Sequence, residues 1–527
     1  MSTTTTSPRV GALHAGHDHG DHDHGDHGSG GGGSSASPPR STLAPASFDA
    51  TMTGTSAGEA ITARLLYRTD LQALNGSGVT GAVDYAVAGN AMTVRVRAEG
   101  LEPDRVHIQH IHGAFDAVGR PKDSFTPGPA ADVDGDGFLE VAEGVPTYGD
   151  ILVNLNSPPG SGLAGFPTAP GGVVDFEQTY DLRARETYNR DYTRADLGDL
   201  ALREFVIHGL SVDGTAGAGT PGEVDGTPGY KLALPAASGE IYAVGVEISA
   251  GGGNDTLTGA GGDDTLLGGD GDDVIAGRGG DDLVFAGAGN DLVRGEDGSD
   301  VVRAGAGNDT VFGGTGNDFV YGDAGDDVLH GDGGLGVGPR RDLGADLLVG
   351  GAGNDRLWVG DGLDTVTGGS GQDTFLFRFN TPQTPLAAGT GAAFATITDF
   401  RAADDTIAFA ARGLEFSGAG AGFRNNGAPG TGGQVLEFFS GAAADARGES
   451  VMVLTDRSFA TGLAAAQAVR GENGGDMILY HNSAVGVASL LFVSAPDVVN
   501  SIARFTDVTS IEALRATGFT AADFIFV

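Results

Sequence analysis

The chain contains no cysteine in its 527 residues. This absence excludes disulfide bridges, thiolate zinc sites and cysteine nucleophiles. Basic residues are also scarce, because Lys and Arg number 30 against 70 Asp and Glu, and the formal net charge is −40. Such a charge argues against binding to nucleic acid or to an anionic membrane surface, and it favours a chain that binds cations.

Long apolar runs are missing as well. No stretch approaches 18 continuous apolar residues, so the sequence predicts no transmembrane segment. The N-terminal stretch MSTTTTSPRVGALHAGHDHGD lacks the apolar core of a secretory signal peptide. If the protein leaves the cell, we therefore expect its export signal elsewhere in the chain.

Glycine, in contrast, is abundant at 93 residues, and much of it belongs to a repeat with a period of nine. The repeat begins near residue 251 with GGGNDTLTG, AGGDDTLLG and GDGDDVIAG, and it continues to about 377, with one degenerate stretch at 331–346. An apolar residue follows each repeated Asp two positions later, as Leu257 and Leu266 do. The in-phase residues are Asp255, Asp264, Asp273, Asp282, Asp291, Asp300, Asp309, Asp318, Asp327, Asp346, Asp355, Asp364 and Asp373.

This pattern has a direct physical interpretation. Glycines permit left-handed turns, Asp carboxylates and turn carbonyls supply the hard oxygen ligands that calcium prefers, and the apolar residue points inward from a short strand. The array resembles the nonapeptide repeat of the repeats-in-toxin (RTX, hemolysin-type calcium-binding) family. The resemblance implies a parallel β-roll over residues 251–378 that holds multiple calcium ions. It also implies a chain that is disordered in the calcium-poor cytosol and folds outside the cell.

The segment after the repeat is predicted to be a β-rich cap over residues 379–527. GQDTFLFRFN (371–380) resembles the closing strand of such arrays, and ATITDFRAADDTIAFA (395–410) resembles the cap of serralysin-like proteins. The chain ends in AADFIFV, as do substrates of the type I secretion apparatus, although a last core strand would have the same sequence pattern. We expect a secreted, extracellular protein, either free or associated with the cell surface, whose tail is dispensable for calcium-dependent folding.

Residues 46–250 form a separate unit in the sequence, set off from the N-terminal tract by the linker GSGGGGSSASPPR. Apolar and polar residues alternate with a period of two in several short segments, which predicts antiparallel strands. These segments are 61–67, 81–87, 92–98, 106–112, 203–209 and 240–248. The fold class is therefore all-β: a Greek-key sandwich, then the roll, then the cap.

The stretch HIQHIHG (107–113) predicts a metal site on this sandwich. On a strand, His110 and His112 share one face, whereas His107 falls on the other. HIQHIHGAFD and DLGDLALREFVIHGLSVDG resemble two segments of the copper/zinc superoxide dismutase family. That resemblance implies that His110, His112 and His208 are copper ligands and that His107 is structural. The chordin-type (CHRD) domain, a non-catalytic sandwich, resembles this region equally well.

The sequence departs from the dismutase pattern in several places. No histidine lies between His112 and His208, so the bridging histidine and the remaining zinc ligands have no counterpart. The cysteine pair is absent, and Ile241 stands where a guiding arginine is expected. The zinc site is thus incomplete, and dismutase activity stays open.

The loop DVDGDGFLEVAE matches the twelve-residue EF-hand calcium loop. Its flanks are poor helix formers, so we expect a calcium loop inside a β-domain rather than a paired EF-hand. The expected ligands are Asp132, Asp134, Asp136, the Phe138 carbonyl and Glu143, with Gly137 at position 6 and the apolar Leu139 at position 8 of the loop.

The N-terminal tract, residues 1–45, alternates His with Asp and Gly. It is expected to be disordered and to bind zinc or copper loosely. The histidines are His14, His17, His19, His22, His24 and His27.

Three functions remain open from the sequence. The chain is a secreted calcium-binding protein with a dismutase-like copper site, a non-catalytic surface-layer, matrix or adhesion protein that assembles with itself or with surface components, or a copper and zinc scavenger. A calcium-dependent secreted scaffold is common to all three.

Overall fold

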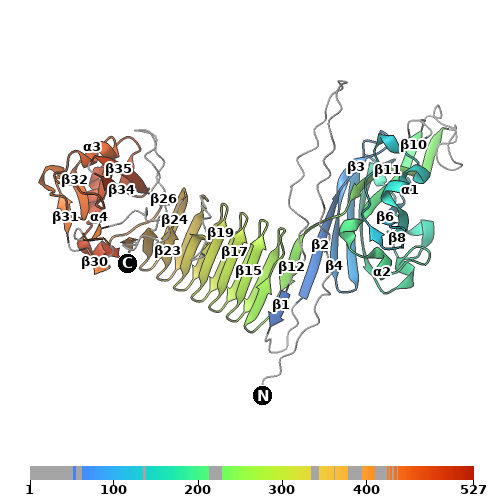
Figure 1. Cartoon of the computed structure of the whole chain (residues 1–527), viewed down its shortest axis with the longest axis horizontal. Coiled ribbons are helices and arrows are strands. Elements are labelled where there is room, and N and C mark those ends of the chain that lie inside the picture. Colours follow the sequence, from blue (N-terminus) through green and yellow to red (C-terminus); the bar gives the residue numbers. More distant parts are fainter. Residues whose placement is uncertain are drawn as a thin grey trace, which may run out of the picture. The chain divides into compact units, whose positions relative to one another are not determined.

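The computed structural model describes residues 51–54, 62–133, 138–212, 228–333, 344–360, 362–377, 395–409, 424–425, 428–429, 433–435, 437–495 and 497–527 (Figure 1). The chain divides into two compact units, of which one spans residues 63–247 and the other combines residues 51–62 with 248–527. Strands dominate both units, which confirms the predicted all-β class. None of the helices in the described residues has the length and apolar character needed to cross a membrane.

The unit spanning residues 63–247 is a β-sandwich. In one sheet, β2 (Thr62–Asp70), β4 (Thr80–Ala88), β5 (Ala91–Glu99) and β9 (Val173–Asp181) pair antiparallel in that order, and β12 (Tyr242–Ser249) pairs with β2. The other sheet has the order β3 (Gln72–Ala73), β11 (Gly229–Glu240), β10 (Glu204–Val212), β6 (Gln109–Phe115) and β7 (Pro121–Lys122), with β8 (Asp150–Asn154) also on β6. Alternate residues of both sheets, such as Val94, Ile111 and Phe205, form one fully buried core.

Two short helices interrupt the sandwich, α1 (Val141–Tyr148) and α2 (Arg194–Leu197). The expectation that the flanks of the 132–143 loop would resist helix formation is wrong on the C-terminal side. Glu140 and Glu143 form a reciprocal capping box that satisfies free N–H groups at the start of α1, and this stabilises a helix that contains Pro146. The 3₁₀ turns are η1 (Pro129–Ala131), η2 (Gly162–Gly165), η3 (Pro170–Gly172), η4 (Arg185–Thr187), η5 (Leu200–Leu202), η6 (Ala443–Asp445) and η7 (Ala521–Asp523).

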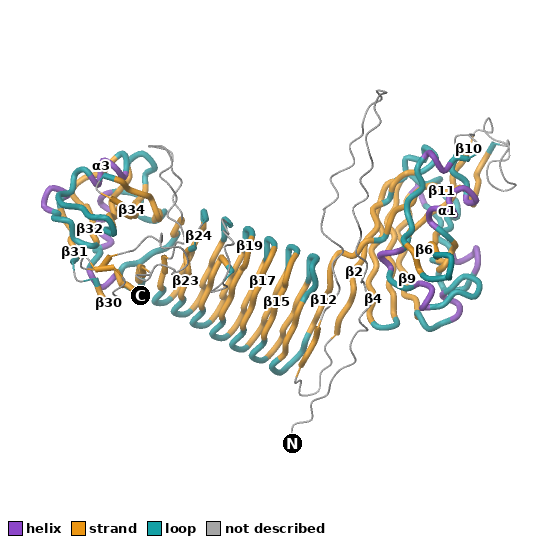
Figure 2. The backbone as a smooth tube through the Cα atoms, in the orientation of Figure 1, coloured by secondary structure: helices purple, strands orange, loops and turns teal. Residues whose placement is uncertain are grey.

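The repeat region forms a parallel β-roll. Each strand pairs with the strand two positions along the chain, so that odd-numbered and even-numbered strands build two sheets joined by short turns (Figure 2). Leu257 lies opposite Ile275, and this pairing sets a coil of two nine-residue repeats. The strands are β13 (Asp255–Thr258), β14 (Thr265–Asp270), β15 (Val274–Gly279), β16 (Leu283–Ala288), β17 (Leu292–Asp297), β18 (Val301–Ala306), β19 (Thr310–Thr315), β20 (Phe319–Ala324), β21 (Val328–Asp332), β22 (Leu347–Ala352), β23 (Arg356–Val359), β24 (Asp364–Ser370) and β25 (Thr374–Phe377). β1 (Thr51–Gly54) pairs antiparallel with β13.

The predicted closing strand does not close the roll. β26 (Ala395–Ile397) and β27 (Thr406–Phe409) continue the parallel stacking on β24 and β25. The pieces of the cap that follow are β28 (Arg424–Asn425), β29 (Ala428–Pro429), β30 (Gly433–Gln434), β31 (Phe438–Gly441), β32 (Val451–Phe459), α3 (Gly462–Ala466), β33 (Met477–Asn482), β34 (Val487–Ala495), β35 (Val498–Phe505), α4 (Ile511–Thr517) and β36 (Phe524–Phe526).

The C-terminal tail is part of the core. β36 lies between β27 and β30, and the side chains of Phe524 and Phe526 are buried. The tail therefore packs as a last core strand, whatever its part in export, and this placement argues against the expectation that it is dispensable for folding.

Candidate functional site

All thirteen repeat aspartates are buried in the turns of the roll, each with at most 3 % of its surface exposed. Except in Asp255 and Asp264, which begin the two rows, the carboxylate oxygen Oδ1 accepts the backbone N–H of the aspartate one coil earlier, as Asp273 does from Asp255 at 2.8 Å. The aspartates thus form two columns. One column contains Asp255, Asp273, Asp291, Asp309, Asp327, Asp355 and Asp373, and the other contains Asp264, Asp282, Asp300, Asp318, Asp346 and Asp364.

The first column has a further member that the sequence interpretation missed. Asp405 accepts the N–H of Asp373 at 3.1 Å, after a gap of 32 residues that hides the period of nine. The signal was nevertheless present, because the buried Ile407 follows Asp405 at the same two-residue spacing as in the repeats.

The residue before most of the repeat aspartates belongs to a second, exposed ladder that was also missed. Asn254 accepts the N–H of Asp272 at 3.0 Å, and Asp272 in turn accepts that of Asn290 at 2.8 Å. This explains why Asn, Asp or Ser recurs there, since a short side chain with an acceptor oxygen can mimic a backbone partner.

The second oxygen of many of these carboxylates has no hydrogen-bond partner among the described residues. This holds for the buried Oδ2 atoms of Asp273, Asp282, Asp291, Asp300, Asp309, Asp327 and Asp355. Burial, with repulsion from Asp264 and Asp300, raises the pKa of Asp282 to about 8. A row of buried, incompletely paired carboxylates needs compensating positive charge, and calcium matches these hard oxygen donors.

The glycines of the turns are required by close backbone approach. Gly287 has φ +122°, and a Cβ atom placed on it would lie 2.0 Å from the carbonyl oxygen of Gly269 in the adjacent coil. A side chain there would push the coils apart and break the aspartate ladder.

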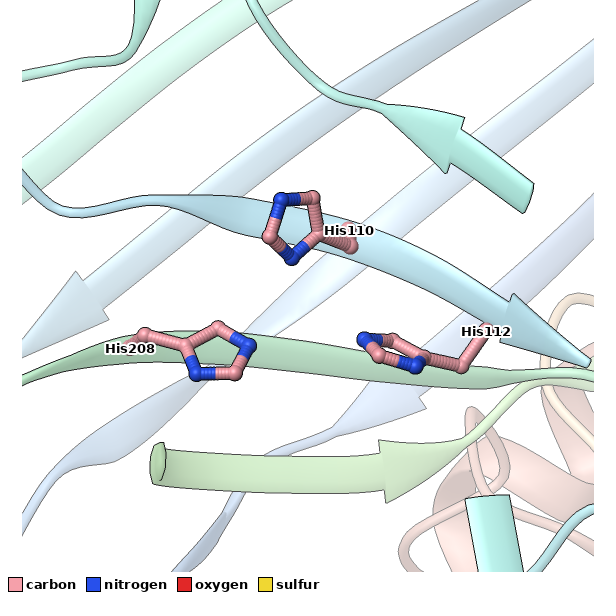
Figure 3. A group of neighbouring side chains, drawn as sticks. All are labelled: His110, His112 and His208. Atoms are coloured by element: carbon pink, nitrogen blue, oxygen red, sulfur yellow. The ribbon is translucent and has the colours of Figure 1, made fainter. Parts of the chain in front are cut away.

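A second site lies on the sandwich, where β6 and β10 run side by side. Val206 pairs with His110, and Glu204 pairs with His112, so these residues and His208 share the face opposite Ile111 and the core. The structure brings His110, His112 and His208 together, with one ring nitrogen from each within 4.8 Å of the others (Figure 3).

His112 and His208 each direct one ring nitrogen to a backbone carbonyl and the other towards the group. His112 donates from Nδ1 to the carbonyl of Gly149 at 3.1 Å, and His208 donates from Nδ1 to that of Ala233 at 2.6 Å. The nitrogens that are buried without a hydrogen-bond partner among the described residues are His110 Nδ1, His112 Nε2 and His208 Nε2. Such outer hydrogen bonds to backbone carbonyls are typical of histidines that bind metal.

Burial also keeps the three rings neutral. It lowers the pKa of His112 to about 3 and that of His208 to about 4, and it places the pKa of His110 well below its ordinary value. The three lone pairs are therefore available to a metal ion at neutral pH, so the residues fit a transition metal of the kind that imidazole binds.

His107 does not join this group. It lies before β6, which begins at Gln109, and its ring nitrogens are 2.9 Å from the carbonyl oxygen of His208 and 3.0 Å from that of Glu102. It holds the backbone of His208, which agrees with the structural role implied by the resemblance.

A buried acid on the same sheet face was missed by the sequence interpretation. Glu204 is fully buried and accepts a hydrogen bond from the hydroxyl of Thr126 at 2.5 Å. Burial raises its pKa to about 8. No motif marked it, because a single acidic residue at the start of a strand has no distinctive spacing.

The EF-hand-like loop is described only at its two ends, since Asp134, Asp136 and Gly137 lie outside the described residues. Glu143 accepts the N–H of Val133 at 2.7 Å and that of Glu140 at 3.2 Å, and the side chain of Asp132 is half-buried. Phe138 packs on a small apolar cluster, and Leu139 is buried. Calcium binding here stays a prediction. The six histidines of the N-terminal tract also lie outside the described residues.

Comparisons with known proteins identify the repeat. The family model for the RTX calcium-binding nonapeptide repeat (4 copies) matches residues 247–275, 267–302, 276–311, 303–336 and 342–375. The chain is 33 % identical over 166 residues to nodulation protein O of Rhizobium leguminosarum bv. viciae, a match that covers 29 % of this chain and 56 % of that protein. The chain thus spans about half the length of the curated relative that it matches. The predicted RTX calcium-binding repeats are confirmed.

Proposed function

We propose that this chain is a secreted calcium-binding protein whose roll folds on extracellular calcium and whose sandwich holds one copper ion between His110, His112 and His208. The buried Oδ2 atoms of the roll support the calcium role. Three buried ring nitrogens that converge without partners support the copper site. The second observation carries the proposal, because it distinguishes this chain from a roll that only binds calcium.

Copper is favoured over zinc for two reasons. Imidazole ligands suit both metals, but nitrogen sites bind Cu²⁺ more tightly than Zn²⁺ in the general affinity order of divalent metals. The His-x-His pair with His208 also resembles the copper half of the dismutases, whereas the zinc half has no counterpart in the sequence.

The copper site can be tested on the full chain in excess calcium. The six histidines of residues 14–27 should first be changed to Asn, so that loose binding there does not contribute. We expect about one tightly held copper per chain after dialysis, and almost none after His208→Ala. A copper content near zero in the chain that retains His110, His112 and His208 would refute the site.

If the copper site is catalytic, we expect it to support weak superoxide dismutation. Copper can cycle between two oxidation states on three imidazoles, but the absence of the bridging histidine and the net charge of −40 oppose fast turnover of an anion. A chain that holds copper and shows no dismutation above free buffer would favour the alternative, a non-catalytic extracellular binding or scavenging module with a CHRD-like sandwich.

We also propose export by a type I apparatus, on the support of the RTX repeats and the apolar C-terminal residues. Cells that carry such an apparatus should release the full chain into the medium, and cells that lack its transporter should retain it. Equal release from both would contradict this route.

A further inference from the structure

The ring nitrogen of His110 that points away from the copper site, Nε2, distinguishes this ring from those of His112 and His208. His112 and His208 direct their outer nitrogens to backbone carbonyls, which the chain itself provides. In His110 the buried nitrogen that faces the other two rings is Nδ1 (Figure 3), and no described residue accepts a hydrogen bond from Nε2. A metal on Nδ1 requires the proton of the neutral ring to reside on Nε2, so this nitrogen is a hydrogen-bond donor without an acceptor from the described chain.

A cleft of about 700 Å³ lies against this ring. His110 lines the cleft although its side chain is only 4 % exposed, whereas His112 and His208 do not line it. Clefts of this size accommodate small organic molecules rather than diatomic ions. The cleft therefore lies on the side of the copper site where His110 Nε2 has no hydrogen-bond acceptor from the described residues.

The walls of the cleft combine an apolar surface with a few polar groups. Leu163 and Phe166 form part of the apolar wall. The rings of Phe166 and His110 pack edge to face, with their centroids 5.6 Å apart. Asn154 lies directly opposite His110 in the β6–β8 pair, on the same sheet face. Arg185 and Glu186 supply one positive and one negative charge at the lining.

Arg185 is available to an anion. Its guanidinium donates to the carbonyl of Tyr188 at 3.1 Å and lies 3.5 Å from the carboxylate of Asp191, but the side chains of Arg185 and Asp191 are 60 % and 107 % exposed. An ion pair this exposed is weak, and a carboxylate that binds the guanidinium through two hydrogen bonds displaces it readily. The negative charge of Glu186 repels a ligand with a second carboxylate, so the lining of the cleft favours a monocarboxylate.

We propose that the cleft binds a small monocarboxylate with an apolar body, whose carboxylate accepts the hydrogen bond from His110 Nε2 and pairs with Arg185. This inference rests on the proposed copper site, because copper on Nδ1 fixes the proton on Nε2. Carboxylates that accept from the outer nitrogen of a metal-bound histidine are a common way to orient the ring and raise its basicity. Here the carboxylate would come from a ligand, so binding in the cleft would alter the copper centre.

Benzoate, with benzamide as its neutral counterpart, tests this inference. Both are titrated into the copper-loaded, calcium-bound full chain with the six N-terminal histidines changed to Asn. Binding is followed by calorimetry and by the electron paramagnetic resonance spectrum of copper. We expect one benzoate per chain, a shifted copper spectrum, and at least about tenfold weaker binding of benzamide.

Two neighbouring substitutions provide a matched pair. Arg185→Gln should weaken benzoate binding by about tenfold or more, whereas Glu186→Gln should leave it unchanged or strengthen it. Both side chains are exposed, so neither change should affect folding, which circular dichroism can verify. Copper content is measured first: a chain without copper refutes the proposed function. A copper-loaded chain that does not bind benzoate, or that binds benzoate and benzamide equally, refutes only the carboxylate site.

Discussion

The sandwich and the roll bury ionisable groups in opposite ways. In the sandwich, the fully buried Arg203 donates to the carbonyls of Leu197 at 2.7 Å and Asp196 at 2.8 Å, and to further carbonyls nearby. In the roll, buried carboxylates repeat every nine residues, and many of their Oδ2 atoms have no partner among the described residues. The buried arginine of the sandwich thus has backbone carbonyls as partners, whereas many buried carboxylates of the roll keep an Oδ2 atom that suits calcium.

This difference sets how each part should respond to calcium. A buried carboxylate without a compensating charge destabilises the folded state, so we expect the roll to be destabilised when calcium is removed. The sandwich has one apolar core between two sheets, so we expect its fold to depend less on calcium.

The largest effect is expected from deletion of residues 523–527. It removes β36 with the buried Phe524 and Phe526, each worth about 3–5 kcal/mol by analogy with large-to-small changes in cores. Calorimetry in calcium should show the loss of the transition of the roll and cap and an unchanged sandwich transition. Deletion of Val527 alone, which is exposed, is the matched control and should have little effect. Unchanged unfolding of the roll and cap in the longer deletion would contradict the placement of β36.

Arg203→Met should have the next largest effect, and it should be confined to the sandwich. It leaves several buried carbonyls without a donor, and we expect a loss of about 3–5 kcal/mol in the free energy of unfolding. Arg97→Met on the exposed side of β5 is the control and should cost less than about 0.5 kcal/mol. Urea unfolding of the sandwich measures both changes. A loss for Arg203→Met as small as that of the control would show that the buried guanidinium of Arg203 contributes little to the free energy of unfolding.

The third prediction concerns pH and belongs to the roll. Burial raises the pKa of Asp291, Asp300 and Asp309 to about 6 and that of Asp282 to about 8, above the ordinary 3.8. A raised pKa in the folded state stabilises the calcium-free roll at low pH, and this contribution is lost as pH rises from about 4 towards 8. Calcium must displace these protons, so the calcium concentration at half-folding should be several-fold higher at pH 5.5 than at pH 8. Equal midpoints in circular dichroism titrations would contradict this.

The smallest effect is expected from His107→Ala. It removes two contacts to backbone carbonyls and should cost about 1–3 kcal/mol of sandwich stability, with copper content retained at about one per chain. His208→Ala is the matched control, which should lose the copper. A folded His107→Ala chain without copper would instead place His107 in the metal site.

The sequence predicted what depends on regular spacing. The period of nine located thirteen of the fourteen aspartates of the two columns, and the alternation of the strands placed His110 and His112 on one face. The approach of His208 followed from a family resemblance rather than from spacing, because contacts between strands distant in the chain are not visible in a local pattern.

What the sequence did not reveal depends on tertiary contacts. Asp405 joins its column across an irregular insertion, and β36 pairs with β27, more than a hundred residues earlier. The helix α1 forms at a segment with poor intrinsic propensity because its capping box outweighs that propensity. The cleft beside His110 is lined by residues of β6, β8 and the following loops, and no sequence motif indicates that these segments lie close together.

Hydrogen exchange of the full chain, resolved by peptide and compared in calcium and in chelator, tests the central difference most directly. We expect peptides from β13 to β27 to exchange slowly in calcium and at the rate of an unfolded chain in chelator. Peptides of β5, β6 and β10 should stay protected in both conditions. A roll that stays protected in chelator, or a sandwich that loses protection together with it, would contradict the account.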